Sequence, residues 1–321
     1  MKLMVLVTGG AGFIGSHVVR RFANDGAIVT VLDNLSSGKC ANVPPDVSFV
    51  EDDIRSASAA QIVREGAFDI VCHLAAQIDV RKSVDDPRFD ADVNIGGSLN
   101  ILEAIRQGGN RSTRFVFSST GGALYGDVET IPTPEEFPKD PLSPYGNAKL
   151  SVEHYMAYYA QVHGLDTVSL RYGNVYGPRQ DSHGEAGVVA IFCERVLTGR
   201  PLTIIGDGRQ TRDYVYVEDV ANANFLAATK SLPERGGLDS RSFNIGTGVE
   251  TSVNELARLV GVAAPNRPAV EHAAARAGEV RRSCLLADKA AASLGWRPRV
   301  SIQDGVQETF DWFRTESLRA S

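Results

Sequence analysis

Tyr145 and Lys149, which stand four residues apart, are the side chains best suited to move a proton. On a helix this spacing puts both on one face, so the ammonium group can hold the phenol in place and lower its pKa. Of the nine tyrosines, only Tyr145 is followed by a lysine at the fourth position. Because a free tyrosine has a pKa of about 10, a phenolate base near neutral pH needs such positive charge nearby.

A glycine-rich turn at residues 8–15 (TGGAGFIG) is the second chemical signal. Gly9, Gly12 and Gly15 fit the spacing GxxGxxG, and Gly10 begins an overlapping GxGxxG. Glycines let the backbone approach a pyrophosphate, and the helix that follows offers free amides to the phosphates. A purely structural tight turn is the alternative. With the tyrosine and lysine, the turn predicts redox chemistry at a sugar or alcohol carbon.

The next apolar run ends at Asp33, eighteen residues after Gly15. A carboxylate at this point can bind the diol of an adenosine ribose. Asp33 followed by the neutral Asn34 would repel a 2′-phosphate, so the pattern favours NAD over NADP.

Two more strand ends carry candidate cofactor contacts. Asp52 and Asp53 follow the third apolar run, where Asp53 would lie beside the adenine; solvated surface charges are the alternative. Residues 73–76 (HLAA) end the fourth run with small side chains that would let a cofactor lie against the backbone. Simple core packing explains them as well.

The elements that must position these residues follow from the hydrophobic pattern. Short β-branched runs alternate with helical patterns such as Ile95, Leu99, Leu102 and Ile105. Strands separated by helices form a parallel sheet covered on both faces, so the predicted fold is α/β, doubly wound and of the Rossmann type. The predicted strands are residues 3–7, 28–32, 47–50, 68–74, 114–118 and 167–171, and the clearest helices are residues 14–22 and 95–105.

The pattern loosens after about Asn174, which predicts a second, smaller α/β lobe that binds substrate. We expect a Rossmann domain at residues 1–173 and this lobe at residues 174–321. Segments near 214–230 and 242–248 should pack back onto the first domain. Within the lobe, the expected elements are a helix at 190–197, a strand at 202–205 and a helix at 253–260.

The approach to Tyr145 is rich in proline, with five prolines between residues 131 and 144. An extended surface loop would explain them. The more specific interpretation is that Ser143 caps a helix and Pro144 occupies its first turn, which fixes where the Tyr145 side chain points.

Composition excludes several classes of protein. The formal net charge is −6, and no run of lysine and arginine points to nucleic acid or an anionic membrane as a partner. The apolar start at residues 1–7 is too short for a signal sequence or a spanning helix, so we expect a cytoplasmic protein. Four scattered cysteines and six histidines show no metal-binding spacing, so we expect no metal.

An ordered set of motifs carries a resemblance to a known family. The chain resembles the extended short-chain dehydrogenase/reductases and, among them, the UDP-glucose 4-epimerases. The motifs are TGGAGFIGSH (8–17), LDNLSSG (32–38), HLAA (73–76), FSSTGGALYG (117–126), SPYGNAK (143–149), LRYGNVYGPRQ (170–180), GDGRQTRDYVYVEDV (206–220) and FNIGTG (243–248).

The resemblance implies a catalytic triad of Thr120, Tyr145 and Lys149. Ser119 is a possible alternate hydroxyl, because the motif is one residue longer than in some relatives. In such enzymes the tyrosine takes the proton from O4 while the C4 hydride moves to NAD, giving a transient 4-keto sugar. The sugar swings about its pyrophosphate, and the hydride returns to the opposite face.

The resemblance also implies the binding residues. The implied NAD contacts are Gly9, Gly12, Phe13, Ile14, Gly15, Asp33, Asn34, Ser37, Gly38, Asp53, Ile54, Leu74, Ala75, Ala76, Asn94, Ser118, Tyr145, Lys149 and Tyr172. The implied UDP-sugar contacts, besides Thr120 and Tyr145, are Asn174, Val188, Thr203, Ile205, Arg212, Arg276, Glu279 and Ser283.

One of these positions bears on the sugar range. In the resembling enzymes, a bulky tyrosine seven residues after the second UDP arginine restricts the pocket to glucose and galactose, while a small residue admits N-acetyl groups. Counting from Arg276, that position is Ser283. The resemblance thus implies activity on UDP-GlcNAc and UDP-GalNAc as well; a loop serine with no effect on selectivity is the alternative.

Related activities are the competing interpretations. Nucleotide-sugar dehydratases and decarboxylases usually carry acidic residues where this chain has residues 121–124 (GGAL). A UDP-glucuronate 4-epimerase, another nucleotide-sugar-modifying member of the family, and a non-catalytic NAD-binding sensor stay open. The resemblance also implies a homodimer, with residues 94–106 and 149–162 as candidate interface helices.

Overall fold

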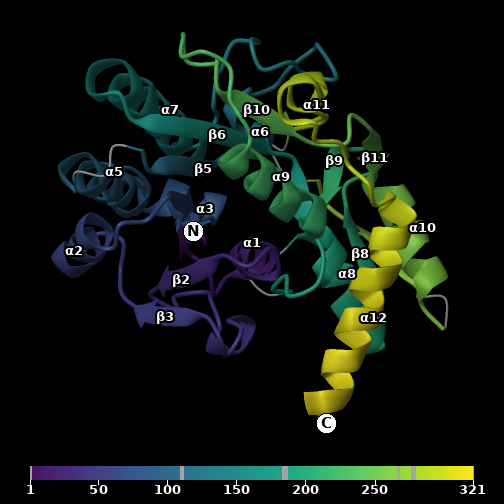
Figure 1. The fold of residues 1–321 in the computed structure, drawn as a ribbon. Helices are drawn as coiled ribbons and strands as arrows, with labels where there is room; N and C mark the ends of the chain where they lie inside the picture. The colour runs from purple at the N-terminus through teal and green to yellow at the C-terminus, as the bar shows by residue number, and fades with distance from the viewer. Residues whose placement is uncertain (1, 109–111, 183–186, 266–267, 276–279, 321) are drawn as a thin grey trace.

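The apolar runs form one parallel sheet at the centre of the molecule (Figure 1). The computed structural model describes residues 2–108, 112–182, 187–265, 268–275 and 280–320. The strand order is β10-β6-β5-β4-β1-β2-β3, and every neighbouring pair is parallel. The strands are β1 (Met4–Thr8), β2 (Ile28–Asp33), β3 (Ser48–Glu51), β4 (Ile70–His73), β5 (Arg114–Thr120), β6 (Asp166–Tyr172) and β10 (Ser242–Ile245). The six predicted strands are all present, so this part of the fold prediction is confirmed.

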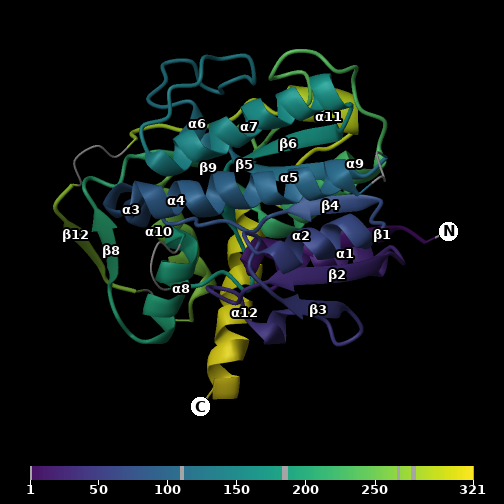
Figure 2. The same cartoon turned by 90° about the vertical axis from the view of Figure 1, so that its left-hand side faces the viewer.

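Helices cover both faces of this sheet, as the doubly wound prediction requires. Phe115 and Phe117 of β5 are buried in the core with α2 (Ala57–Glu65), α5 (Gly97–Gln107) and α7 (Pro144–His163). Val116, between them, belongs to the core on the opposite face, with α1 (Phe13–Asn24) and α9 (Val217–Thr229). Figure 2 shows α7, α5 and α2 across one face. Successive side chains of a strand point to opposite faces, which explains the split.

The segment after β4 runs through short helices that pack against α7 (Pro144–His163). These are α3 (Val80–Asp85), α4 (Pro87–Ala91) and a π-helix (Asp92–Gly96) that continues into α5; a short 3₁₀-helix (Cys40–Asn42) precedes β3, and α6 (Gly121–Leu124) follows β5. Asp79 and Asp86 cap α3 and α4, because their side chains accept hydrogen bonds from backbone amides of the first turns.

A second, smaller lobe is built mostly from the C-terminal half of the chain. A three-stranded sheet contains β7 (Asn174–Tyr176), β9 (Thr211–Tyr216) and β11 (Glu250–Ser252), and β8 (Leu202–Ile205) pairs with β12 (Val270–Ala273). The lobe's helices are α8 (Val188–Leu197), α10 (Val253–Ala263) and α12 (Ile302–Ala320), with Phe192, Leu256 and Phe310 in its core. Two elements of this half return to the Rossmann sheet: β10 pairs with β6, and α9 packs against α1, while α11 (Asp288–Leu294) lies against β10.

The start of α7 is as the sequence predicts. The Ser143 hydroxyl accepts a hydrogen bond from the Gly146 amide at 3.1 Å, and Pro144 is the first residue of the helix. Gly164, at a φ of +74°, ends it. The cap therefore fixes where the helix begins, one residue before Tyr145.

No helix in the described ranges is long and apolar enough to cross a membrane. Within those same residues, no group of three or more histidine, cysteine, aspartate or glutamate side chains could hold a metal ion.

Candidate active site at the carboxyl ends of the central strands

A cleft of about 430 Å³ opens at the carboxyl ends of β1, β2, β4 and β5. Ligands of open parallel sheets bind at this edge, where the strand order reverses. Seventeen of the nineteen predicted cofactor residues line it, namely Gly9, Gly12, Phe13, Ile14, Gly15, Asp33, Asn34, Ser37, Asp53, Ile54, Leu74, Ala75, Ala76, Ser118, Tyr145, Lys149 and Tyr172. The remaining two, Gly38 and Asn94, lie behind the wall, against Asp33 and Gln77 respectively.

The glycine turn is shaped so that no side chain fills the cleft. Gly9 has a φ of +71°, and a Cβ there would lie 2.6 Å from the backbone nitrogen of Ala75. A Cβ on Gly15 would collide with the Gly9 carbonyl. The first turn of α1 carries no acidic residue, so its free amides are open to an anion. A pyrophosphate group fits this cradle.

Asp33 lies at the end of β2 and is only 7% exposed. Its Oδ2 accepts from the Ala11 amide and its Oδ1 from the Leu35 amide, each at 2.9 Å, which fixes the carboxylate at the cleft wall. Arg55 is the only arginine among the described residues that line the cleft, and its guanidinium is paired with Asp53 and Asp92, each at 2.8 Å. A 2′-phosphate would have to break these pairs, so the site fits NAD better than NADP.

Arg55 also holds the Asp53 carboxylate in its charged form. Hydrogen bonds from the Arg55 side chain, together with one from Asn34, keep the pKa of Asp53 well below its usual range. The sequence analysis therefore identified Asp53 as a cleft residue but did not identify Arg55 as its main hydrogen-bond partner.

Tyr145 and Lys149 line the same cleft from the first turns of α7. The Lys149 ammonium donates to the Ser118 carbonyl at 2.9 Å and lies 5.8 Å from the centre of the Tyr145 ring. Burial lowers the pKa of Lys149 to about 8, although the charges of Asp90 and Glu153 oppose this shift. Burial raises the pKa of Tyr145, and the charge of Asp90 raises it further.

The expected low pKa of Tyr145 is therefore not produced by the groups of this chain alone. Burial of the phenol and the charge of Asp90 raise its pKa above the ordinary value. A phenolate at neutral pH needs further positive charge in the cleft.

Ser119 and Thr120 end β5 beside this pair. Ser119 lines the cleft, is 3% exposed, and its hydroxyl has no hydrogen-bond partner among the described residues. By strand alternation it continues the Phe115 and Phe117 face that α7 covers. Thr120 is not part of the cleft lining and occupies the position before α6. A buried hydroxyl without a partner is available to a bound molecule, so the choice between the two hydroxyls stays open.

The sequence missed a second group of lining residues. Gln77, Ile78, Asp79 and Lys82 come from the loop and helix that directly follow residues 73–76. Their position directly after a predicted strand end is the sequence feature that could have identified them as cleft residues. The others are Leu32, Ser36, Arg55, Phe89 and Val93.

The predicted UDP contacts lie outside this cleft, in the second lobe. Six are described, on β7 (Asn174), α8 (Val188), β8 (Thr203, Ile205), β9 (Arg212) and the segment after β12 (Ser283). Arg276 and Glu279 fall outside the described residues.

Two of the six lie close to α6, the short helix that follows Thr120. The Asn174 side chain lies 3.7 Å from where a Cβ on Gly122 would stand. The Ser283 amide donates to the Thr211 carbonyl at 3.2 Å, and Leu285, two residues on, packs against Gly121. Elsewhere in the lobe, Thr203 accepts from Arg195 at 2.5 Å, and Arg212 donates to the Thr211 carbonyl at 2.8 Å.

The similarity of this chain to known proteins covers both lobes. A family model described as "NAD dependent epimerase/dehydratase family" matches residues 5–246. The chain is 44% identical over 322 residues to the UDP-glucose 4-epimerase of Mycolicibacterium smegmatis, covering 98% of this chain and 100% of the relative.

Two solved structures are similar over nearly their whole length. The UDP-glucose 4-epimerase of Thermotoga maritima, solved with UDP-glucose, has a TM-score of 0.92 at 46% identity and covers 98% of this chain and 100% of that one. The UDP-glucose 4-epimerase of Thermus thermophilus, solved with NAD, has a TM-score of 0.89 at 48% identity and covers 97% and 99%.

Proposed function

The chain belongs to the NAD dependent epimerase/dehydratase family, and from this premise we propose that Tyr145 is the base with which it inverts C4 of a UDP-hexose. It is an NAD-dependent isomerase of the UDP-glucose 4-epimerase type. One observation carries the assignment of the base: the unique tyrosine–lysine pair lines the same cleft as the glycine turn.

Tyr145 accepts the proton of O4, and Lys149, held by the Ser118 carbonyl, places positive charge beside the phenol. NAD, which the cleft residues would hold, would supply the acceptor for the C4 hydride and a second positive charge. Loss of the C4 hydride and the O4 proton would leave a sugar that is ketonic and flat at C4. After the sugar turns, Tyr145 would return the proton to O4, and the same hydride would return to the opposite face of C4.

The hydroxyl of Thr120 or Ser119 would hold O4 during this exchange. Ser119 has the free hydroxyl in the cleft, while the resemblance favours Thr120, which lies beside Asn174 at Gly122. We keep Thr120 as the principal candidate and Ser119 as the alternate.

The second lobe, residues 174–321, would anchor UDP so that only the sugar turns. Arg212 supplies a planar fork of donors for the diphosphate, and Arg276 is proposed as its partner by resemblance. Asn174, Val188, Thr203, Ile205, Glu279 and Ser283 complete the proposed set.

Elimination of water is the less favoured chemistry. The turn of α6, Gly121–Leu124, which follows Thr120 directly, carries no acidic or basic side chain. A second acid–base pair is therefore missing from this position, and epimerisation needs only Tyr145. A UDP-glucuronate 4-epimerase remains the alternative within the same mechanism.

A homodimer through α5 and α7 is proposed on surface chemistry. Tyr155, Tyr158 and Val162 of α7 are 43%, 47% and 61% exposed and form an apolar strip on its outer side. Aromatic residues are enriched in such interfaces. Figure 2 shows α5 and α7 on the outer side of the same face. The proposed location of the protein is the cytoplasm.

The test is turnover without added cofactor. The purified protein is incubated with UDP-glucose, UDP-galactose, their N-acetyl counterparts and UDP-glucuronate, and the products are identified by proton NMR. Interconversion of UDP-glucose and UDP-galactose is expected. A protein that retains NAD yet leaves every sugar unchanged would be the binding-only sensor, and exclusive action on UDP-glucuronate would favour the alternative.

A further inference from the structure

Asp90, in α4, lies one layer behind the cleft and is 1% exposed. Its Oδ1 accepts from the side-chain amides of Gln77 at 2.9 Å and Asn94 at 3.0 Å. Its Oδ2 is buried without a hydrogen-bond partner, the only carboxylate oxygen in that position among the described residues. Such an atom is costly to bury, so its presence beside the site calls for a reason.

Oδ1, the hydrogen-bonded oxygen of Asp90, supports the cleft wall. Gln77 lines the cleft, and its backbone amide also donates to the Asn94 side chain at 2.9 Å. The Asn94 amide returns a hydrogen bond to the Gln77 carbonyl at 3.0 Å. Asp90 therefore holds together the two side chains that fix the loop after β4.

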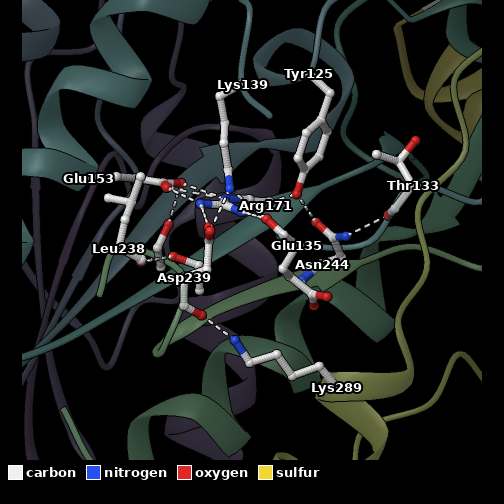
Figure 3. A network of polar contacts seen from close by, with 12 residues as sticks. Tyr125, Thr133, Glu135, Lys139, Glu153, Arg171, Leu238, Asp239, Asn244 and Lys289 are labelled. Carbon is white, nitrogen blue, oxygen red and sulfur yellow. Dashed lines mark hydrogen bonds and ion pairs between the residues drawn. The ribbon is translucent and has the colours of Figure 1, made fainter. Parts of the chain in front are cut away.

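The charge of Asp90 is not offset by a cation. Its partners are neutral amides, and within the described residues no ion pair includes it. Glu153, the other carboxylate near Lys149, is different, because Arg171 pairs with it at 2.6 Å and both side chains are at most 1% exposed (Figure 3). Asp90, whose helix α4 packs against α7, is thus a buried carboxylate near the Tyr145–Lys149 pair that has no ion-pair partner among the described residues.

The remaining groups around the pair do not cancel this charge. On β4, burial and then the charge of Lys149 lower the pKa of His73 to about 3, so the imidazole is neutral near pH 7. On α3, Ser83 meets the Tyr145 backbone with an uncharged hydroxyl, and Lys82, an exposed residue of the cleft wall, holds its ammonium group 4.6 Å over the Phe89 ring. On α7, Glu153 is balanced by Arg171 of β6. Among these groups, Asp90 is the one whose charge raises the pKa of the phenol.

We propose that Asp90 is a positioning residue that sets the working pH of the Tyr145–Lys149 pair, a role that rests on the proposed function. An epimerase tyrosine must take a proton and then give the same proton back. Lys149 favours the first step by stabilising phenolate. The Asp90 carboxylate favours the second step, because its negative charge opposes the phenolate and stabilises the ammonium form of Lys149.

Asp90→Asn tests this with little change of shape. The asparagine oxygen can still accept from Gln77 and Asn94, while the charge is gone. Without it, the pKa values of Tyr145 and Lys149 both fall, because Asp90 raises each of them. The acid and alkaline limbs of the kcat profile should both move to lower pH by about one unit, the size expected of one charge nearby.

Asp85→Asn is the matched control, since it removes an exposed carboxylate from the end of α3 and should leave both limbs in place. Limbs that stay fixed in Asp90→Asn while kcat falls at every pH would overturn the proposal and leave Asp90 a structural role only. A move to higher pH would overturn it as well. If Asp90→Asn does not fold, Asp90→Ser, whose hydroxyl can accept one amide, carries the same prediction.

A spectroscopic titration separates this result from failure of the proposed function. Near-ultraviolet tyrosinate absorbance of the NAD-loaded protein is recorded against pH, with the Tyr145→Phe form subtracted in each background. The Tyr145 titration should lie about one pH unit lower in Asp90→Asn than in the wild type, whatever reaction the enzyme catalyses. Superimposable titrations would reject the role of Asp90 even if epimerisation is confirmed, and a shift without sugar turnover would reject only the proposed reaction.

Discussion

Replacing Lys149 with methionine should stabilise the nucleotide-free protein near neutral pH while it abolishes turnover. Burial lowers the pKa of Lys149 to about 8. A free lysine has a pKa of about 10.4, so the pKa is lower in the folded chain by roughly 2.5. Below pH 8, burying the charged lysine therefore lowers the free energy of unfolding by about 3 kcal/mol. Methionine loses the hydrogen bond to the Ser118 carbonyl, which is worth about 1 kcal/mol. The expected net gain is about 2 kcal/mol.

The stability difference between wild type and the methionine variant depends on pH. The native chain releases the Lys149 proton near pH 8, while the unfolded chain keeps it until about pH 10.4. The wild-type free energy of unfolding should therefore rise across this window, and the advantage of methionine should shrink over the same range.

Denaturant unfolding at about pH 7 and about pH 9.5 measures both effects. Nucleotide is removed first, because bound NAD would add its own stabilisation. Lys230→Met, at an exposed site, is the control and should show the same small difference at both pH values. A methionine variant that is less stable at about pH 7, or a stability difference that does not change with pH, would refute the reasoning.

Three further predictions concern the turn, the pocket and the surface. Gly9→Ala should lower the amount of NAD retained by the purified protein about tenfold or more. An alanine in the left-handed conformation costs at least about 1 kcal/mol, and its Cβ would collide with the backbone of Ala75. If the denatured protein released as much NAD as the wild type, the role of the glycine turn in binding pyrophosphate would be refuted. Ser283→Tyr should remove activity on N-acetylated UDP-sugars and spare UDP-glucose, and equal activities in both proteins by NMR would reject the gatekeeper. Tyr158→Glu should convert a dimer to a monomer in light scattering, whereas a monomeric wild type would contradict the proposed interface.

Much of the fold could be predicted because single strands and turns obey local rules. Val116 between Phe115 and Phe117 marks a strand buried on both faces. Ser143 and Pro144 give the start of α7 from capping chemistry alone. The glycine turn and Asp33 placed the cleft correctly, since both follow strand ends that the sheet brings to one edge.

The rest depends on contacts between distant segments. Asp90 has no motif of its own, and its importance follows from Gln77, from Asn94 and from the burial of Tyr145 on another helix. Spacing predicted that Lys149 and Tyr145 share a helix face, but it could not show that burial raises the pKa of the phenol and lowers the pKa of the lysine. The depth at which a group is buried is set by the whole fold, so the direction of such a pKa shift is hard to predict from local sequence.

The central claim is that Tyr145 exchanges the O4 proton in a cleft that retains NAD. The most direct test compares wild type with Tyr145→Phe, both carrying NAD, by following conversion of UDP-glucose to UDP-galactose with proton NMR. Loss of the phenolic hydroxyl removes the base but not the packing of the ring. We predict a rate at least about a hundredfold lower with NAD content unchanged, and conversion at the wild-type rate would contradict the mechanism.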